Sequence, residues 1–118
     1  MCFMYGGMLD PIAGQLERYM DLLGARQKLV AANIANADTP GYRAADIDFQ
    51  TEFHNAMGGA PRAIEVAGLA ATNDGNNVSL DRESRLLAEN ALRFQLAAGL
   101  LRADIQKVRL AIKEGQSA

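Results

Sequence analysis

The sequence has few of the residues from which most catalytic and metal sites are built. Its 118 residues include one Cys, one His and no Trp. A single Cys excludes an internal disulfide and a multi-Cys zinc site, and a single His argues against a His-based metal cluster or a Ser-His-Asp site. No second nitrogen or thiol ligand lies near His54 in the sequence, so we interpret it as an ordinary surface or boundary residue. We expect no enzymatic activity, no metal and no cofactor.

The sequence also lacks an excess of charge of one sign and a long hydrophobic run. Its 12 basic and 14 acidic residues leave a formal net charge of −2. This balance argues against binding nucleic acid or an anionic membrane by bulk charge, although residues 81–113 carry more basic than acidic side chains. Without a run of about 18 apolar residues, no membrane-spanning helix is predicted. We expect neither a nucleic-acid partner nor a small-molecule substrate.

The first residues are apolar but too few, and too poor in basic residues, to form a cleaved secretory signal. We therefore expect residues 1–9 to be a flexible N-terminus and the chain to carry no cleaved signal peptide. Met1, Met4 and Met8 are alternative starting residues, and Cys2 has no expected role.

A long helix is predicted over residues 10–36. Asp10 is a suitable N-cap, and Pro11 suits the first helical position, where its missing N–H costs nothing. Steps of three, four or seven residues place the apolar side chains on one face. This face includes Leu16, Leu23, Val30 and Ile34.

The middle segment, residues 37–79, is rich in Gly, Asn, Asp and Pro and is expected to be mostly irregular. Thr39-Pro40-Gly41-Tyr42 fits a type II turn, and Asp74-Gly75 is a second turn signal. A short helix is predicted after Asp48, ending at Gly58-Gly59, and alternation around Ile64 and Val66 favours one short strand. The spacing of Asp46 and Asp48 ahead of the short helix indicates capping rather than acid–base catalysis.

A second helix is predicted over residues 80–115. Ser79 or Asp81 can cap its start, and Gly115 is a plausible stop. Its apolar residues keep a 3.5-residue period over nearly four heptads, which is typical of a coiled-coil seam. The stripe consists of Leu87, Ala91, Phe94, Ala98, Leu101, Ile105, Val108 and Ile112.

The predicted helices are too long for a compact globule of this size. Such a globule would be about 35 Å across, whereas a helix over residues 81–113 would be about 50 Å long. We therefore predict a mainly α fold, an elongated antiparallel pair of long helices with a short irregular, β-containing middle. A two-helix pair leaves part of each apolar face exposed, which indicates completion by other chains.

The end of the first helix carries a polar motif with two interpretations. Asn33 and Asn36 lie three residues apart on one face. They can supply ordinary helix-end and turn chemistry, or side-chain amides that bond to backbone at a packed junction between subunits. From the residues alone these alternatives stay open.

Residues 32–42, ANIANADTPGY, resemble the N-terminal signature of the flagellar axial proteins, the family of rod, hook and hook-associated subunits. Residues 43–49 (RAADIDF), residues 74–81 (DGNNVSLD) and the run from Leu87 to Gln95 are similar to the rod members of that family. The resemblance covers about residues 9–115. The motif residues are Asn33, Ile34, Ala35, Asn36, Thr39, Pro40, Gly41 and Tyr42.

The resemblance implies a structural subunit of the proximal flagellar rod, exported unfolded and placed in the basal body within the periplasmic space. It implies as partners other copies of the chain, further rod proteins, the membrane ring with its export gate, and the export apparatus. Packing is expected between the stripe residues Leu87, Phe94, Leu101, Ile105, Val108 and Ile112 and the first-helix residues Leu16, Leu23, Val30 and Ile34. The alternatives are another rod subunit of the family or a soluble helical-hairpin adaptor that folds alone.

Overall fold

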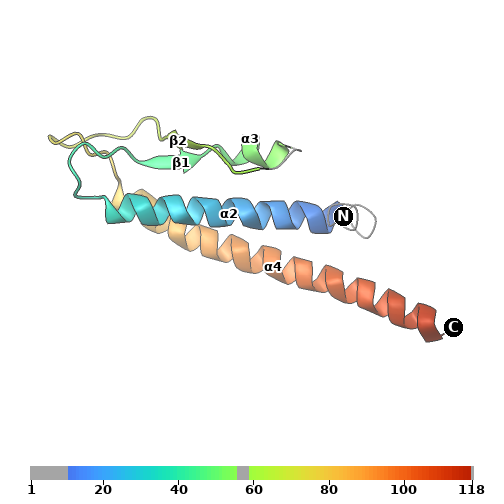
Figure 1. Cartoon of the computed structure of the whole chain (residues 1–118). Helices are drawn as coiled ribbons and strands as arrows, with labels where there is room; N and C mark the ends of the chain where they lie inside the picture. The colour runs from blue at the N-terminus through green and yellow to red at the C-terminus, as the bar shows by residue number, and fades with distance from the viewer. Residues whose placement is uncertain (1–10, 56–58, 118) are drawn as a thin grey trace.

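The computed structural model describes residues 11–55 and 59–117. The elements follow in the order α2 (Pro11–Ala35), β1 (Ala45–Ile47), α3 (Phe49–His54), β2 (Ala63–Glu65) and α4 (Leu80–Ser117). Figure 1 shows α2 in the middle, with α4 along one side and the small sheet with α3 along the other. The radius of gyration is 18.8 Å and the longest extent is 71 Å, against about 13–14 Å for the radius of a globule of this length. The predicted elongated, mainly α fold is confirmed.

Helix α2 begins at Pro11 and ends at Ala35, close to the predicted bounds. Its buried residues are Leu22, Leu23, Val30 and Asn33. Leu23 and Val30 belong to the predicted apolar face, and Leu22 adds a second side because the helix is covered both by α4 and by the middle segment. The proposed cap Asp10 and the flexible N-terminus expected over residues 1–9, with Cys2, lie outside the described residues.

The middle segment contains one more strand than predicted. Strand β2 agrees with the strand expected around Ile64, and it pairs antiparallel with β1 in the register Ala45↔Glu65. Strand β1 was not predicted because three residues are too few to show an alternating pattern. Its position matters for the site, because β1 lies directly against α2.

Helix α3 begins as predicted and ends earlier. The Asp48 side chain accepts a hydrogen bond from the backbone N–H of Thr51, so Asp48 is the N-cap. The helix ends at His54 rather than at Gly58-Gly59. Asn55 adopts an extended backbone, and its N–H closes the last turn on the Glu52 carbonyl at 3.2 Å. Gly58 lies outside the described residues.

Helix α4 begins after Ser79, whose hydroxyl accepts from the backbone N–H of Arg82 at 3.2 Å. It runs for 38 residues to Ser117, about 57 Å at helical rise. The predicted stop at Gly115 is wrong. Gly115 does not adopt the positive φ of a helix-ending glycine, and glycine inside a helix costs only about 1 kcal/mol relative to Ala.

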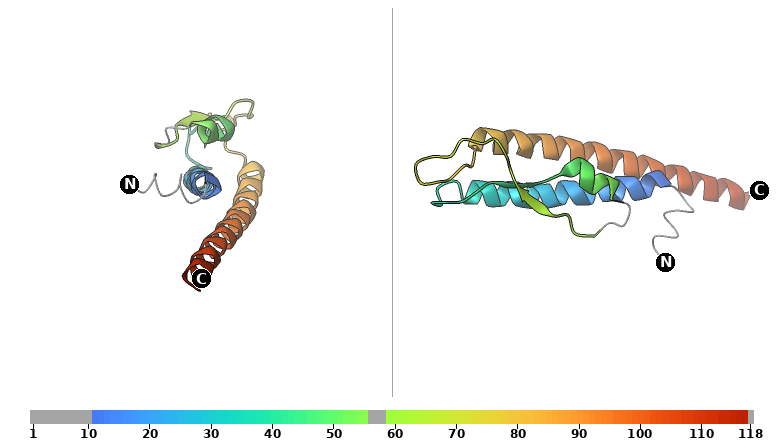
Figure 2. Two further views of the ribbon diagram at one scale, coloured as in Figure 1. Left: turned by 90° about the vertical axis from the view of Figure 1, so that its right-hand side faces the viewer. Right: turned by 90° about the horizontal axis from the view of Figure 1, so that it is seen from above.

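The core is thin and sits between α2, the start of β1 and α4. Its buried apolar residues are Leu22, Leu23, Val30, Ala44, Ile47 and Ala97. Buried polar residues accompany them, namely Asn33, Asp46, Asn76, Asn77, Glu83 and Asn90. Within residues 11–55 and 59–117, no helix is both long and apolar enough to span a membrane. Figure 2 shows the molecule along and across its long axis, with the far part of α4 diverging from α2.

Candidate functional site: a polar junction and an exposed helix face

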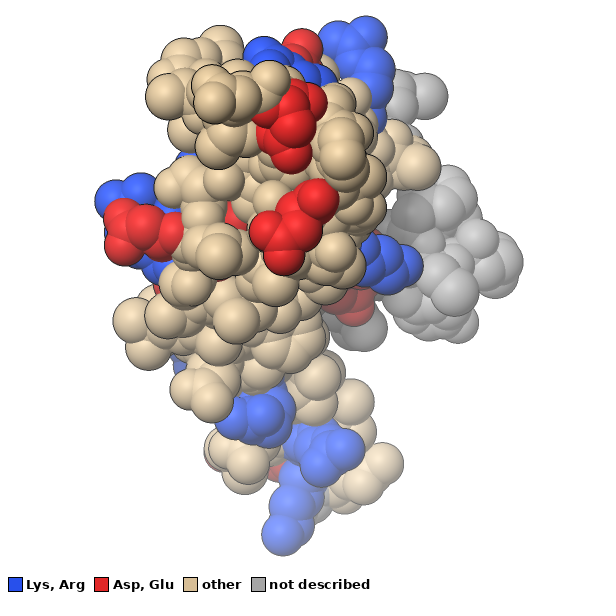
Figure 3. Space-filling model, turned by 90° about the vertical axis from the view of Figure 1, so that its left-hand side faces the viewer, with Lys and Arg blue, Asp and Glu red and all other residues tan. Residues whose placement is uncertain are grey.

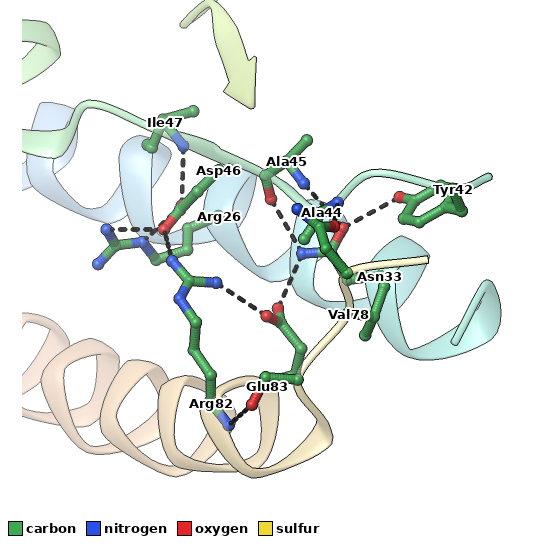
Figure 4. Close-up of polar contacts among 12 residues, drawn as sticks. Arg26, Asn33, Tyr42, Ala44, Ala45, Asp46, Ile47, Val78, Arg82 and Glu83 are labelled. Atoms are coloured by element: carbon green, nitrogen blue, oxygen red, sulfur yellow. Dashed lines mark hydrogen bonds and ion pairs between the residues drawn. The ribbon is translucent and has the colours of Figure 1, made fainter. Parts of the chain in front are cut away.

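Asn33 is the centre of a polar junction that joins α2, β1 and α4 (Figure 4). Its side chain is fully buried. The amide nitrogen donates to the Ala45 carbonyl at 2.9 Å and to Glu83 Oε1 at 2.8 Å. The amide oxygen accepts from the Tyr42 hydroxyl at 3.0 Å and from the Ala45 N–H at 3.1 Å. All four hydrogen-bonding positions of the amide are therefore used within one chain.

A line of alternating charges extends the junction. Arg26 Nε contacts Asp46 Oδ1 at 3.0 Å, and Arg82 contacts Asp46 Oδ2 at 2.8 Å. The other arm of Arg82 contacts Glu83 Oε2, also at 2.8 Å. Two cations and two anions lie together at low exposure, so the group is neutral and each charge keeps a partner, which burial requires.

The two asparagines after the Asp74-Gly75 turn attach the rest of the middle segment. The Asn76 amide donates to the carbonyls of Asn36 and Thr39, each at 2.8 Å. The Asn77 amide oxygen accepts from the Ala44 N–H at 2.6 Å. The segment before α4 is thereby held to the end of α2 and to the residue preceding β1.

The two asparagines Asn33 and Asn36 fit different interpretations of the motif. The Asn36 amide donates to the Ala32 carbonyl at 2.8 Å, and its oxygen accepts from the Thr39 hydroxyl. This is helix-end and turn chemistry. Asn33 instead bonds backbone and side chains at a packed junction, which in the structure lies within the chain. A role for either amide between subunits stays a prediction.

The predicted type II turn is confirmed. The Tyr42 N–H donates to the Thr39 carbonyl at 3.2 Å, and Gly41 has a φ of +75°. Only glycine adopts this left-handed conformation without strain. The turn reverses the chain after α2 and brings the Tyr42 hydroxyl back to Asn33.

The face of α4 that meets α2 differs from the predicted stripe. Its buried residues are Glu83, Asn90 and Ala97, seven residues apart. Asn90 donates to the Leu23 carbonyl at 2.8 Å and to Gln27 Oε1 at 3.1 Å. These polar contacts and the small side chain of Ala97 hold this face inward, and the stripe residues Ala91 and Phe94 lie at the edge of the interface, beside Leu23.

The predicted stripe on α4 consequently lies largely at the surface. Leu87, Phe94, Ile105 and Ile112 are 40–54% exposed, and Leu101 and Val108 are half-buried. Of the expected partners on α2, Leu23 and Val30 are buried, Leu16 is half-buried and Ile34 is 38% exposed. The residues of α4 that are buried against α2 are therefore Glu83, Asn90 and Ala97, and the expected pairing of the two stripes stays a prediction.

More exposed apolar side chains follow α4 on its other side. Leu92, Leu96, Leu100 and Leu110 are 52–68% exposed. Leu96 and Leu100, with Ile12, Leu16, Tyr19 and Phe53, line a groove between α4, α2 and α3. α4 thus exposes apolar side chains on two sides, with charged side chains between them, and exposed apolar area of this kind is typical of a surface that other protein covers.

No group of three or more His, Cys, Asp or Glu side chains that could hold a metal ion occurs among the residues that the structure describes. His54 is exposed, as predicted. The Thr72 hydroxyl and the Asn76 N–H donate to the Asp74 carboxylate and lower its pKa below the ordinary 3.8. This carboxylate acts within a turn.

Sequence reasoning did not find the charged members of the junction. The sequence analysis does not single out Arg26, Arg82 or Glu83, and it interprets Asp46, together with Asp48, as capping. Glu83 carried a usable signal, because it lies seven residues before Asn90 and fourteen before Ala97 on one face. No local pattern pointed to the two arginines, whose partner Asp46 is distant in the sequence.

Comparison with known proteins agrees with these features. The sequence model of the family described as "Flagella basal body rod protein" matches residues 20–43. "Flagellar basal body rod protein FlgB" of Escherichia coli is 32% identical, over 92% of this chain and 99% of that protein. The protein of the same name from Salmonella typhimurium is 31% identical over 92% and 99%. That from Cereibacter sphaeroides is 38% identical over 75% and 83%.

An elongated helical pair with a thin core and exposed apolar faces fits a structural protein that assembles with other chains. With relatives of this identity along nearly its whole length, the chain belongs to the family of flagellar basal body rod proteins FlgB.

Proposed function

We propose that the chain is a structural subunit of the flagellar rod, in which the α4 stripe packs against neighbouring subunits. The observation that carries this proposal is the exposure of Leu87, Phe94, Ile105 and Ile112 on one helix. Full burial of such a side chain stabilises by about 1.5–3 kcal/mol. Burial of several such side chains in each subunit is enough to drive association between subunits. This role needs no catalytic or cofactor site.

The geometry favours an open assembly. The exposed residues of α4 differ from those of α2, so a contact between them joins two unlike surfaces. Such heterologous contacts generate a helical shaft when the rotation does not close into a ring. The stripe residues would then meet Leu16 and Ile34 of neighbouring subunits, whereas Leu23 and Val30 stay in the core of their own subunit.

The polar junction gives this subunit a defined shape. Asn33 and the charges at Asp46 join α2, β1 and α4 at one place, so the sheet and both helices keep fixed relative positions. A shaft that transmits torque from motor to hook needs subunits that do not deform under load. The junction supports that role because it resists sliding of α4 along α2.

The proposed neighbours are further copies of the chain, other rod proteins, and the membrane ring with its export gate. We place the subunit in the proximal rod, within the periplasmic part of the basal body, after transit through the flagellar export apparatus. The relatives from Escherichia coli and Cereibacter sphaeroides carry the name of a basal body rod protein, which supports this placement. We propose no enzymatic activity, cofactor, small-molecule substrate or nucleic-acid partner.

The test is Leu101→Asp in a strain that lacks its own copy of the gene. Leu101 is half-buried on the stripe, and an unpaired charge buried between subunits costs several kcal/mol. We expect loss of motility and absence of the subunit from purified basal bodies. Gln106→Asp adds the same charge on an exposed position of α4 and should leave both unchanged. Normal motility of Leu101→Asp would contradict the packing scheme.

Circular dichroism separates a rod subunit from a helical-hairpin adaptor. If the exposed faces are completed by other chains, helix content should rise with protein concentration. An adaptor that folds alone would show a cooperative transition with the same midpoint at every concentration.

A further inference from the structure

The turn at Asp74-Gly75 carries a chemically reactive pair of residues. In such a pair the main-chain nitrogen of the second residue can attack the aspartate side chain, and glycine has no side chain to shield that nitrogen. Asp74-Gly75 is the single Asp-Gly pair of the sequence, which has no Asn-Gly pair, and the Asp74 side chain is exposed. The connection that carries this turn reaches the end of the molecule opposite the C-terminus of α4 (Figure 1), and Figure 3 shows acidic side chains on the surface at that end.

The conformation of the turn requires glycine at position 75. Gly75 has a φ of +86°, in the left-handed region that other residues adopt only with strain. A Cβ atom on Gly75 would also lie 3.5 Å from the Cα atom of Gly41, the glycine of the turn that follows α2. The reactive pair is therefore built into this turn, since a larger residue in place of Gly75 would strain it.

The peptide group between Asp74 and Gly75 is held on both sides. Its carbonyl accepts a hydrogen bond from the Gly41 N–H at 2.8 Å, and its N–H donates to the Thr72 carbonyl at 2.9 Å. For the nitrogen to bond to the Asp74 carboxyl carbon, the N–H must give up its proton and the peptide group must turn. Both hydrogen bonds are lost in that step, so the folded turn opposes the attack.

The charge of the Asp74 carboxylate opposes the same reaction. Ring closure expels a carboxyl oxygen as water, which requires the protonated carboxyl group. The Thr72 hydroxyl and the Asn76 N–H donate to the charged carboxylate and lower the pKa of Asp74 below its ordinary value. At neutral pH the folded turn thus reduces the protonated fraction that can react.

We propose that Asp74 is a site of spontaneous conversion to isoaspartate, which the folded turn suppresses and which becomes reactive when the chain is unfolded. The Gly75 nitrogen bonds to the Asp74 carboxyl carbon and loses its proton, while a carboxyl oxygen leaves as water. A solvent water molecule then opens the imide ring. Opening at the side-chain carbonyl restores aspartate, whereas opening at the main-chain carbonyl leaves a main chain that runs through Cβ. One water leaves and one enters, so the mass of the chain is unchanged.

Conversion would prevent the turn from forming again. The main chain becomes one atom longer at Asp74, and the former main-chain carbonyl becomes a free carboxylate. The Gly41 N–H then loses its carbonyl partner, and Gly75 is displaced from its position against Gly41. Asn76, which attaches this segment to the end of α2, moves with the turn. We therefore expect a converted chain to refold with lower stability.

The test compares the full chain in native buffer and in guanidinium chloride over several weeks at 37 °C and the same neutral pH. Trypsin cuts after Arg62 and Arg82, so one peptide, residues 63–82, contains Asp74 and also Asp81, which is the internal control. Electron-transfer dissociation distinguishes isoaspartate from aspartate in this peptide. The isolated peptide, incubated in both solutions, measures the effect of the denaturant on the chemistry itself.

We expect Asp74 to convert in the denatured chain and Asp81 to stay aspartate in both solutions. In the folded chain the conversion of Asp74 should be slower by about tenfold or more, because opening the turn breaks two hydrogen bonds of the peptide group. Absence of isoaspartate at Asp74 in the denatured chain, or conversion of Asp81 as fast as that of Asp74, would overturn the assignment of the site. Equal rates in the folded and the denatured chain would overturn the protection by the turn.

Two variants distinguish local opening of the turn from general loosening of the fold. Asn76→Ala and Asn90→Ala each remove a buried amide that donates two hydrogen bonds, at the turn and between α4 and α2 respectively. Circular dichroism first verifies that both variants are folded. In native buffer Asn76→Ala should speed the conversion of Asp74 about fivefold and Asn90→Ala less than about twofold. Equal acceleration by the two variants would contradict a local effect of the turn.

The converted and unconverted fractions of the wild-type chain are finally refolded and compared in a urea titration. The converted fraction should unfold at a lower urea concentration, and equal midpoints would contradict the expected damage to the turn. These measurements do not depend on how subunits pack, so Leu101→Asp tests the proposed function separately.

Discussion

Replacing Asn33 by Ala tests whether the polar junction holds the fold together. The substitution removes four hydrogen bonds at a fully buried position. The Ala45 N–H and carbonyl lose about 1 kcal/mol each, and the buried Glu83 carboxylate loses a bond worth about 2 kcal/mol. The Tyr42 hydroxyl is only half-buried and can turn to water. We expect the free energy of unfolding to fall by about 3–5 kcal/mol, a large part of the total stability of a small domain.

The assay is a urea titration followed by circular dichroism, at one protein concentration for all variants because association adds to stability. Asn36→Ala is the matched control. It removes a bond to the Ala32 carbonyl and one from Thr39 at a more exposed position, so its expected cost is about 1 kcal/mol. Asn33→Asp distinguishes the effect of lost side-chain volume from the effect of lost hydrogen bonds. It keeps the size of the side chain but loses both donors and faces Glu83 with a second carboxylate, so it should destabilise at least as much as Asn33→Ala.

The reasoning would be refuted by an Asn33→Ala variant that unfolds within about 1 kcal/mol of the parent chain. That result would mean that water or a shift of β1 replaces the lost bonds. An Asn33→Asp variant as stable as the parent would contradict the assignment of both amide hydrogens to Ala45 and Glu83.

Three further predictions follow from single contacts. Asp46→Asn leaves Arg26 without its charged partner and Arg82 with Glu83 alone, and it should cost about 2–4 kcal/mol in a urea titration. Glu65→Gln, in an exposed ion pair, should cost under about 1 kcal/mol. Gly14→Ala, at an open helical position, should raise the free energy of unfolding by up to about 1 kcal/mol. Because its pKa is lowered, Asp74 contributes stability above its unfolded pKa near 3.8 that is lost as pH falls through the lower folded value. A carboxyl NMR titration should show the Asp74 midpoint below 3.8 and moving toward it in Thr72→Val.

The start and capping of the helices could be predicted because they depend on neighbours in the sequence. Pro11 begins α2, the Ser79 hydroxyl accepts at the start of α4, and Asp48 caps α3 as expected. The ends were harder. α3 stops at His54 and α4 continues through Gly115, because the end of a helix depends on what the following residues contact.

Periodicity identified the apolar stripe of α4 but not the face that meets α2. A 3.5-residue repeat states which side chains share a face, and it does not state which partner they meet. In the structure Glu83, Asn90 and Ala97 face α2 because their partners, including Asn33 and the Leu23 carbonyl, lie on another element. The stripe itself lies largely at the surface, whereas the sequence analysis expected it to pack against the apolar residues of the first helix.

By itself the sequence determined that this protein is helical, elongated and poor in core. Helix length and apolar spacing are local properties, and the predicted second helix is longer than the diameter of a globule of this size. Only the tertiary structure decided that a chain of arginines, carboxylates and one asparagine joins α2 to β1 and α4. Those contacts connect residues up to 50 positions apart, and their strength depends on burial and on the exact meeting of donors with acceptors. Neither property is visible until the chain is folded.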